Sequence, residues 1–119
     1  MALELQHTLF PYRMVLKRKT PVELSITIKN TGSEPTLASF QMQLPRSLGL
    51  DKSGFKSGVS SQLGMLAAGE EKRFVFDVYP KGGVGPGEHP IQLSAFTHYR
   101  DYSYVTNTYN KNLSLIVDY

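Results

Sequence analysis

The chain has 119 residues, of which 40% are hydrophobic and 19% are charged, and its formal net charge is +3. This balance is too apolar for a disordered chain, and the length fits one domain with a single core over residues 1–119. The absence of cysteine excludes disulfides and thiolate metal sites.

Alternation of apolar and polar side chains recurs along the chain, with prolines and glycines between the alternating segments. This period of two predicts β-strands that each have one dry face and one wet face. The inward-facing residues that it predicts, in chain order, are Leu3, Leu5 and Leu9; Val22, Leu24, Ile26 and Ile28; Ala38, Phe40, Met42 and Leu44; Phe74, Phe76 and Val78; Ile91, Leu93, Ala95, Thr97 and Tyr99; and Leu113, Leu115 and Val117.

Two further segments are predicted as strands on weaker patterns. Residues 13–17 are expected to form a short second piece of the first strand, and residues 62–66 a separate strand. The total is seven or eight antiparallel strands, and no helical pattern is present. The connection over residues 45–61 is too long for an up-and-down meander, so we expect two packed sheets, an all-β sandwich, rather than a barrel.

Motifs that carry chemistry are sparse. The glycine-rich segment 81–89 lacks the Lys-Ser/Thr pair of a phosphate-binding loop, and no G-x-S-x-G elbow is present. His89 and His98 point to opposite faces of one predicted strand, and Asp51 has no second carboxylate nearby for calcium. We therefore predict no catalytic residue, no metal and no cofactor, identify no small-molecule substrate, and predict that the protein is not an enzyme.

Charge and hydropathy also limit the partners. The densest basic run, Lys17 to Lys19, is typical of a solvated loop and is too short to neutralise several phosphates, so nucleic acid is not expected as a partner. No segment approaches the ~20 apolar residues of a membrane span, and we predict neither membrane insertion nor a signal peptide. The location stays open: extracellular if the chain is excised from a surface protein, and cytoplasmic otherwise.

One stretch stands out, "HYRDYSYVTNTY" over residues 98–109, which holds four tyrosines and an arginine around a predicted tight turn. Tyrosine and arginine are enriched where proteins contact partners, because they bury area with few rotatable bonds and keep a polar tip. The same tyrosines also suit cross-strand pairs on a sheet surface, which need no ligand. The candidate partner-binding residues are Tyr99, Arg100, Tyr102 and Tyr104.

Three segments together resemble a known group of modules: "TPVELSITIKNTGSEP", "LGMLAAGEEKRFVFDVYP" and "GPGEHPIQLSAFTHYRD". Their order is similar to that of immunoglobulin-like modules of prokaryotic surface proteins, including CARDB-type cell-adhesion-related domains and S-layer-associated repeats. His89 stands where such modules usually have tyrosine. The segment "SFQMQLPRSLGL" is also similar to a strand of adaptin-ear appendage domains, which are intracellular sandwiches that bind peptides. The resemblance implies an immunoglobulin-like sandwich.

Two functions are carried forward from these patterns. The first is a non-catalytic structural or adhesion module that contacts other proteins. The second is a small intracellular β-sandwich that binds an extended peptide, or another copy of itself, along an exposed sheet edge. A third option is a carbohydrate-binding sandwich that uses the aromatic residues between Tyr99 and Tyr109.

Overall fold

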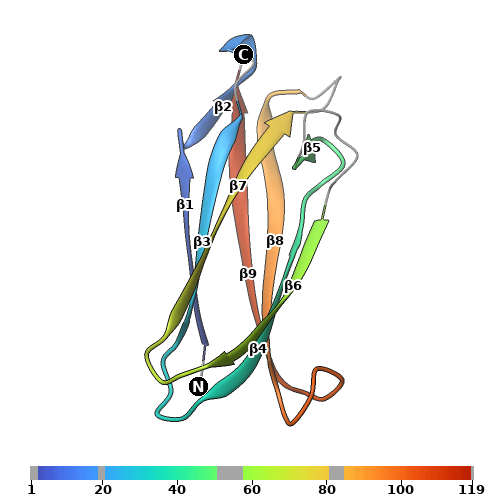
Figure 1. Cartoon of the computed structure of the whole chain (residues 1–119). Coiled ribbons are helices and arrows are strands. Elements are labelled where there is room, and N and C mark those ends of the chain that lie inside the picture. The colour runs from blue at the N-terminus through green and yellow to red at the C-terminus, as the bar shows by residue number, and fades with distance from the viewer. Residues whose placement is uncertain (1–2, 19–20, 51–57, 81–84, 119) are drawn as a thin grey trace.

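The computed structural model describes residues 3–18, 21–50, 58–80 and 85–118, and these residues form two facing β-sheets (Figure 1). One sheet has four strands, in the order β1 (Leu3–Phe10), β3 (Val22–Asn30), β7 (Glu71–Pro80) and β5 (Leu48–Gly49). The other has five, in the order β2 (Arg13–Val15), β9 (Val105–Asp118), β8 (Gly87–His98), β4 (Thr36–Gln43) and β6 (Gly58–Leu66). The prediction of an all-β fold is confirmed.

The strand count and direction differ in detail from the prediction. The described residues form nine strands rather than seven or eight, because β5 is a two-residue strand that is too short to show a period. Every pair of the described strands is antiparallel except one, in which β2 pairs in parallel with the end of β9. Residues 13–15 therefore do not extend the first strand in its own sheet. They cross to the opposite sheet, although they follow β1 after only two residues.

The core lies between the sheets and is built from the predicted inward faces. The alternating residues of β3, Val22 to Ile28, are at most 1% exposed, and those of β4 are equally enclosed. Phe40 of the five-stranded sheet packs against Phe74 and Phe76 of the four-stranded sheet, with ring centroids 5.6 and 6.4 Å apart. This contact joins the two layers, and Phe74 and Phe76 are partly buried against the core.

Tyr99 was predicted to point inward, and this prediction is wrong. Its side chain is 58% exposed, because β8 ends at His98 and the alternation ends with it. The inward residues Ile91, Leu93, Ala95 and Thr97 that precede Tyr99 on β8 are buried as predicted. Tyr99 instead opens the loop that connects β8 to β9, at the lower end of the molecule in Figure 1.

Several predicted features fall outside the described residues. They include Asp51, the first half of the glycine-rich segment 81–89 and Lys19 at the end of the basic run. Lys17 lies in the single-turn 3-10 helix η1 (Leu16–Arg18). No helix in the described part of the chain is long and apolar enough to cross a membrane.

Candidate functional site

The predicted tyrosine-rich turn is the loop of the β8–β9 hairpin, residues 99–104. The Tyr99 N–H donates to the Tyr104 carbonyl oxygen at 3.0 Å, which closes the loop at its base. The Asp101 N–H donates to the Tyr99 carbonyl at 2.8 Å, and the Ser103 N–H donates to Asp101 Oδ1 at 2.9 Å. An aspartate that accepts from a backbone N–H two residues later is typical of a tight turn. Hydrogen bonds between the loop's own polar groups therefore stabilise this turn.

The hydrogen bonds at Asp101 also affect its acidity. The side-chain and backbone hydrogen bonds from Ser103 hold the pKa of the Asp101 carboxyl below its usual value, since both favour the ionised form. The carboxylate thus stays charged across the neutral range and keeps its two acceptor contacts.

Arg100 follows Tyr99 in this loop and lies beside its ring. Its φ of 70° lies in the left-handed region, which is uncommon for residues other than glycine. Its guanidinium carbon lies 5.1 Å from the centroid of the Tyr99 ring, within range of a cation–π interaction. The charged group and the ring are therefore presented together.

The four predicted binding residues separate into two groups. Tyr99 and Tyr104, which are 58% and 63% exposed, lie with Arg100 at the surface of the loop. Tyr102 folds back onto the five-stranded sheet, where its hydroxyl accepts a hydrogen bond from the Gly64 N–H of β6 at 2.9 Å. Its ring meets the edge of His98 at a centroid distance of 5.1 Å. Tyr102 thus connects the loop to β6.

A cleft of about 530 Å³ lies beside the exposed group, between the hairpin loop and the neighbouring ends of β4 and β6. Met65 of β6, 60% exposed, lines it together with Tyr99 and Arg100. The remaining lining residues are Pro35, Thr36, Leu37, Thr97, His98, Thr106 and Asn107. Sequence reasoning missed Met65 and Leu37, because they come from other strands; β6 reaches this position through the irregular pairing at Ala38/Ser39, beside Gly64.

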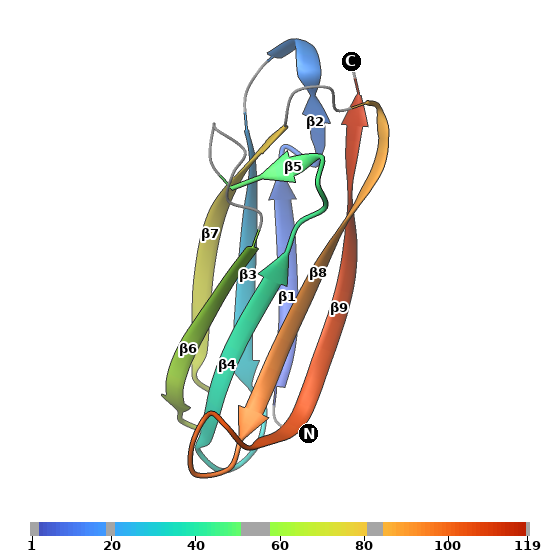
Figure 2. The ribbon, with the colours of Figure 1, turned by 90° about the vertical axis from the view of Figure 1, so that its right-hand side faces the viewer.

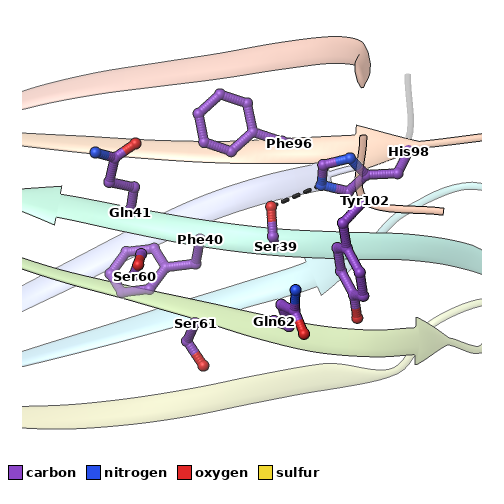
Figure 3. A pocket seen from close by; sticks show the side chains of 9 residues that line it. All are labelled: Ser39, Phe40, Gln41, Ser60, Ser61, Gln62, Phe96, His98 and Tyr102. Atoms are coloured by element: carbon purple, nitrogen blue, oxygen red, sulfur yellow. Dashed lines mark hydrogen bonds between the residues drawn. The ribbon is translucent and has the colours of Figure 1, made fainter. Parts of the chain in front are cut away.

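A second hollow, of about 570 Å³, lies on the outer face of the five-stranded sheet, the face turned toward the viewer in Figure 2. Figure 3 shows its side chains, which come from β4, β6, β8 and the hairpin loop. We call this hollow the sheet groove. Its lining residues are Ser39, Gln41, Ser60, Ser61, Gln62, Phe96, His98 and Tyr102, together with Phe40, whose side chain is buried in the core.

The three histidines occupy separate places. His98 Nε2 shares a hydrogen bond with Ser39 Oγ at 2.7 Å, in the sheet groove (Figure 3). His89 Nε2 contacts the Gly85 carbonyl oxygen at 2.9 Å, and its Nδ1 contacts Ser47 Oγ at 2.5 Å. His7 lies on β1. Among the described residues, no group of histidine and carboxylate side chains is placed to hold a metal ion.

No protein-family model and no curated protein sequence matches this chain. It is similar in structure to the bacterial hydrophobin BslA, with a TM-score of 0.53 and 10% identity over 98% of this chain and 93% of that one. It also resembles part of the alkylpurine DNA glycosylase AlkC of Pseudomonas fluorescens bound to DNA, with a TM-score of 0.49 and 12% identity. That match covers 99% of this chain but 31% of the glycosylase. These likenesses concern the fold alone, since a fold carries many functions.

Proposed function

We propose that the protein is a non-catalytic adhesion or protein-interaction module of the immunoglobulin-like type, which contacts a partner protein through the end of the sandwich that carries the β8–β9 hairpin. We call this surface the hairpin end and define it by Leu37, Met65, Tyr99, Arg100 and Tyr104. The single observation that carries the proposal is the cleft in which Tyr99, Arg100 and Met65 line one exposed and mainly apolar surface.

The residue composition of the hairpin end supports a role in binding a partner protein. Exposed apolar side chains that gather in one place often mark interaction sites, whereas single ones need no explanation. Tyrosine, methionine and arginine are enriched in the cores of protein interfaces. Here all three line one cleft, and Tyr104 lies next to it through its hydrogen bond with Tyr99.

The hydrogen bonds within the loop, and between the loop and β6, support the same role. The Asp101 and Ser103 contacts fix the turn, and Tyr102 ties it to β6. A surface that is ordered before binding loses less conformational entropy when a partner arrives, so more of the contact energy appears as affinity.

The test uses the purified chain immobilised as bait, with extract and surface fractions of the organism that encodes it. We expect quantitative mass spectrometry to find a protein that the parent captures and that the double variant Tyr99→Ser, Met65→Ser loses. Each of these side chains is largely exposed, so the variant should keep its fold, which circular dichroism checks.

The chain offers a matched control at the opposite end of the sandwich. Tyr12 is 69% exposed, and the Arg13 guanidinium lies 5.5 Å from its ring, so this pair has the same chemistry as Tyr99 and Arg100. The variant Tyr12→Ser should keep the captured protein. Equal capture by the parent and by both variants would show that the hairpin end is not the contact surface.

The alternative function, binding of an extended peptide or of a second copy at a sheet edge, is favoured by β6. Among the described strands, β6 pairs only with β4, and its nine residues, "GVSSQLGML", carry no charge. Natural edge strands usually carry charges or proline that block further pairing. We expect Ser60→Lys to abolish any self-association seen by sedimentation, whereas Ser114→Lys on β9 should not. A parent that is strictly monomeric and captures no peptide from a displayed library would refute this alternative.

A further inference from the structure

The two outer faces of the sandwich differ in where their charged side chains lie. The outer face of the four-stranded sheet carries exposed charged side chains on all three of its long strands: Glu4, Glu23, Lys29, Arg73 and Asp77. On the five-stranded sheet, three hollows lie along the outer faces of β4, β6, β8 and β9. No aspartate, glutamate, lysine or arginine lines any of these three hollows in the described part of the chain. The three hollows are therefore polar but uncharged, and the exposed charges of this sheet, Glu88, Arg13 and Asp118, lie outside them.

The polar groups of the sheet groove are amides and hydroxyls. Gln41 and Gln62 are exposed, one on β4 and one on β6, and Ser60 is exposed beside them. Each such group can donate and accept hydrogen bonds. The outer faces of β8 and β9 continue the pattern past Phe96, where Gln92 of β8 and Asn110 of β9 line the neighbouring hollow. A nucleic acid or another phosphate ligand would need cations that this groove does not offer.

Aromatic side chains line the same groove. Phe96 lies half-buried on the outer face, with its ring centroid 6.4 Å from that of His98, which in turn lies 5.1 Å from Tyr102. Two of these rings are fixed by hydrogen bonds, His98 by Ser39 and Tyr102 by Gly64. The faces of aromatic rings carry partial negative charge and attract weakly positive C–H groups. Because these rings are already held in place, a ligand that stacks on them would lose little entropy in ordering them.

We propose that the sheet groove binds a neutral oligosaccharide chain. A sugar ring presents hydroxyls that both donate and accept, together with C–H faces, and it carries no charge, so it matches the amides, hydroxyls and rings of this groove. The volume of about 570 Å³ is within the ~300–1,000 Å³ of small-molecule sites. The further polar hollow beside Gln92 and Asn110 extends the same chemistry along the sheet, which suits a chain rather than a single sugar. This proposal goes beyond the protein contact at the hairpin end and uses different residues.

The test is isothermal titration calorimetry of the full chain with a panel of neutral oligosaccharides: cello-, xylo-, manno-, malto-, laminari- and chito-oligosaccharides. We expect binding of at least one of them, with an affinity that does not change between low and high salt, because no charge takes part. An oligogalacturonide serves as the charged probe and should bind more weakly. Failure of the whole panel at millimolar concentration, or tighter and salt-dependent binding of the oligogalacturonide, would overturn the proposal.

Variants locate the site. Phe96→Ala and Gln62→Ala should each weaken the binding by about tenfold. Because Gln62 is exposed, Gln62→Ala still tests the groove if Phe96→Ala disturbs the sheet. Gln6→Ala, on the charged outer face of the other sheet, should bind as the parent does. Binding that both groove variants keep at full strength would place the sugar elsewhere, and preferential binding of an uncharged peptide library over the panel would assign the groove to peptides instead.

Discussion

The side-chain amide of Asn30 donates one hydrogen bond to the Leu66 carbonyl oxygen at 2.9 Å, and so joins the end of β3 to the end of β6 in the opposite sheet. The same nitrogen donates to the Glu34 carbonyl at 2.9 Å, and Oδ1 accepts from the Gly32 N–H. Asn30 is fully buried. One side chain thus fixes the turn that follows β3 and ties the two layers together at that point.

Asn30→Ala should lower the free energy of unfolding by about 2–4 kcal/mol, because buried carbonyl and N–H groups lose their partners at ~1–3 kcal/mol each. Chemical denaturation followed by circular dichroism measures the loss. Asn112→Ala is the control, because Asn112 is exposed on the outer face of β9, and it should change the stability little. If both variants lowered the free energy of unfolding by the same small amount, the Asn30 amide would not be needed to stabilise the turn.

Ile26→Asp should unfold the protein. Ile26 is fully buried at the centre of β3, where a carboxylate would meet no partner and would keep none of its hydration. Thr27→Asp places the same group on the outer face, next to Arg73 in register, and should leave the fold intact. Thermal unfolding of both variants compares the two faces directly. A folded Ile26→Asp variant would contradict the inward register of β3.

Stability should fall as the pH is lowered below about 6.5, in part through His7. Burial, and then the positive charge of Lys111, lower the pKa of His7 in the folded protein below its usual value of 6.5, and its Nδ1 is buried without a hydrogen-bond partner among the described residues. Above the pKa that His7 has in the unfolded chain, its side chain is neutral in both the folded and the unfolded protein. Below it, the unfolded chain takes up a proton that the folded chain resists, so the contribution of His7 is lost as the pH falls toward the folded pKa.

The difference in unfolding free energy between His7→Leu and the parent, measured from pH 8 to pH 5, isolates this contribution. It should grow in favour of the variant as the pH falls below 6.5, since leucine at this position takes up no proton. Lys111→Gln should make the parent's pH dependence shallower, because it removes the second cause of the shift. A difference that stays constant over this range would show that His7 titrates equally in both states.

Asp101 should titrate at a lower pH than an ordinary aspartate, and Ser103→Ala should move its pKa back up. The hydrogen bonds from Ser103 are the largest causes of the lowered pKa, and the variant removes the first of them. Carboxyl carbon shifts in an NMR titration give both values. If the carboxyl of the variant titrates as in the parent, the Ser103 hydroxyl does not hold the loop.

The sequence could predict the dry faces of the strands but not their partners. Alternation identified Ile26 and Phe40 as core residues, because burial on one face of a strand leaves a period of two. The same rule cannot tell which sheet a strand joins, and so the crossing of β2 to pair with β9 was missed. It also fails where a strand ends or bends, as at Tyr99, which lies just past β8, and at Gly64, where the β4–β6 register shifts.

The candidate sites show the same limit. The exposed polar residues of β4 and β8 follow from their alternation, and the tyrosine-rich turn is visible in composition. The sequence does not show that these residues come together. Ser39, Gln62 and Phe96 lie far apart in the chain, and the strand order β8-β4-β6 brings them side by side. The cleft at the hairpin end depends on Met65 in the same way.

The parallel pairing of β2 with β9 bears on how the module would respond to mechanical load. β1 begins at the hairpin end, and β9 ends at the opposite end of a body 47 Å long (Figure 1). A force applied between these two points runs along the strands. It would therefore load the hydrogen bonds between neighbouring strands all at once, in shear, instead of breaking them one after another. The Arg13–Asp118 ion pair, at 3.0 Å, lies on that β2–β9 pair and adds a charged contact to it.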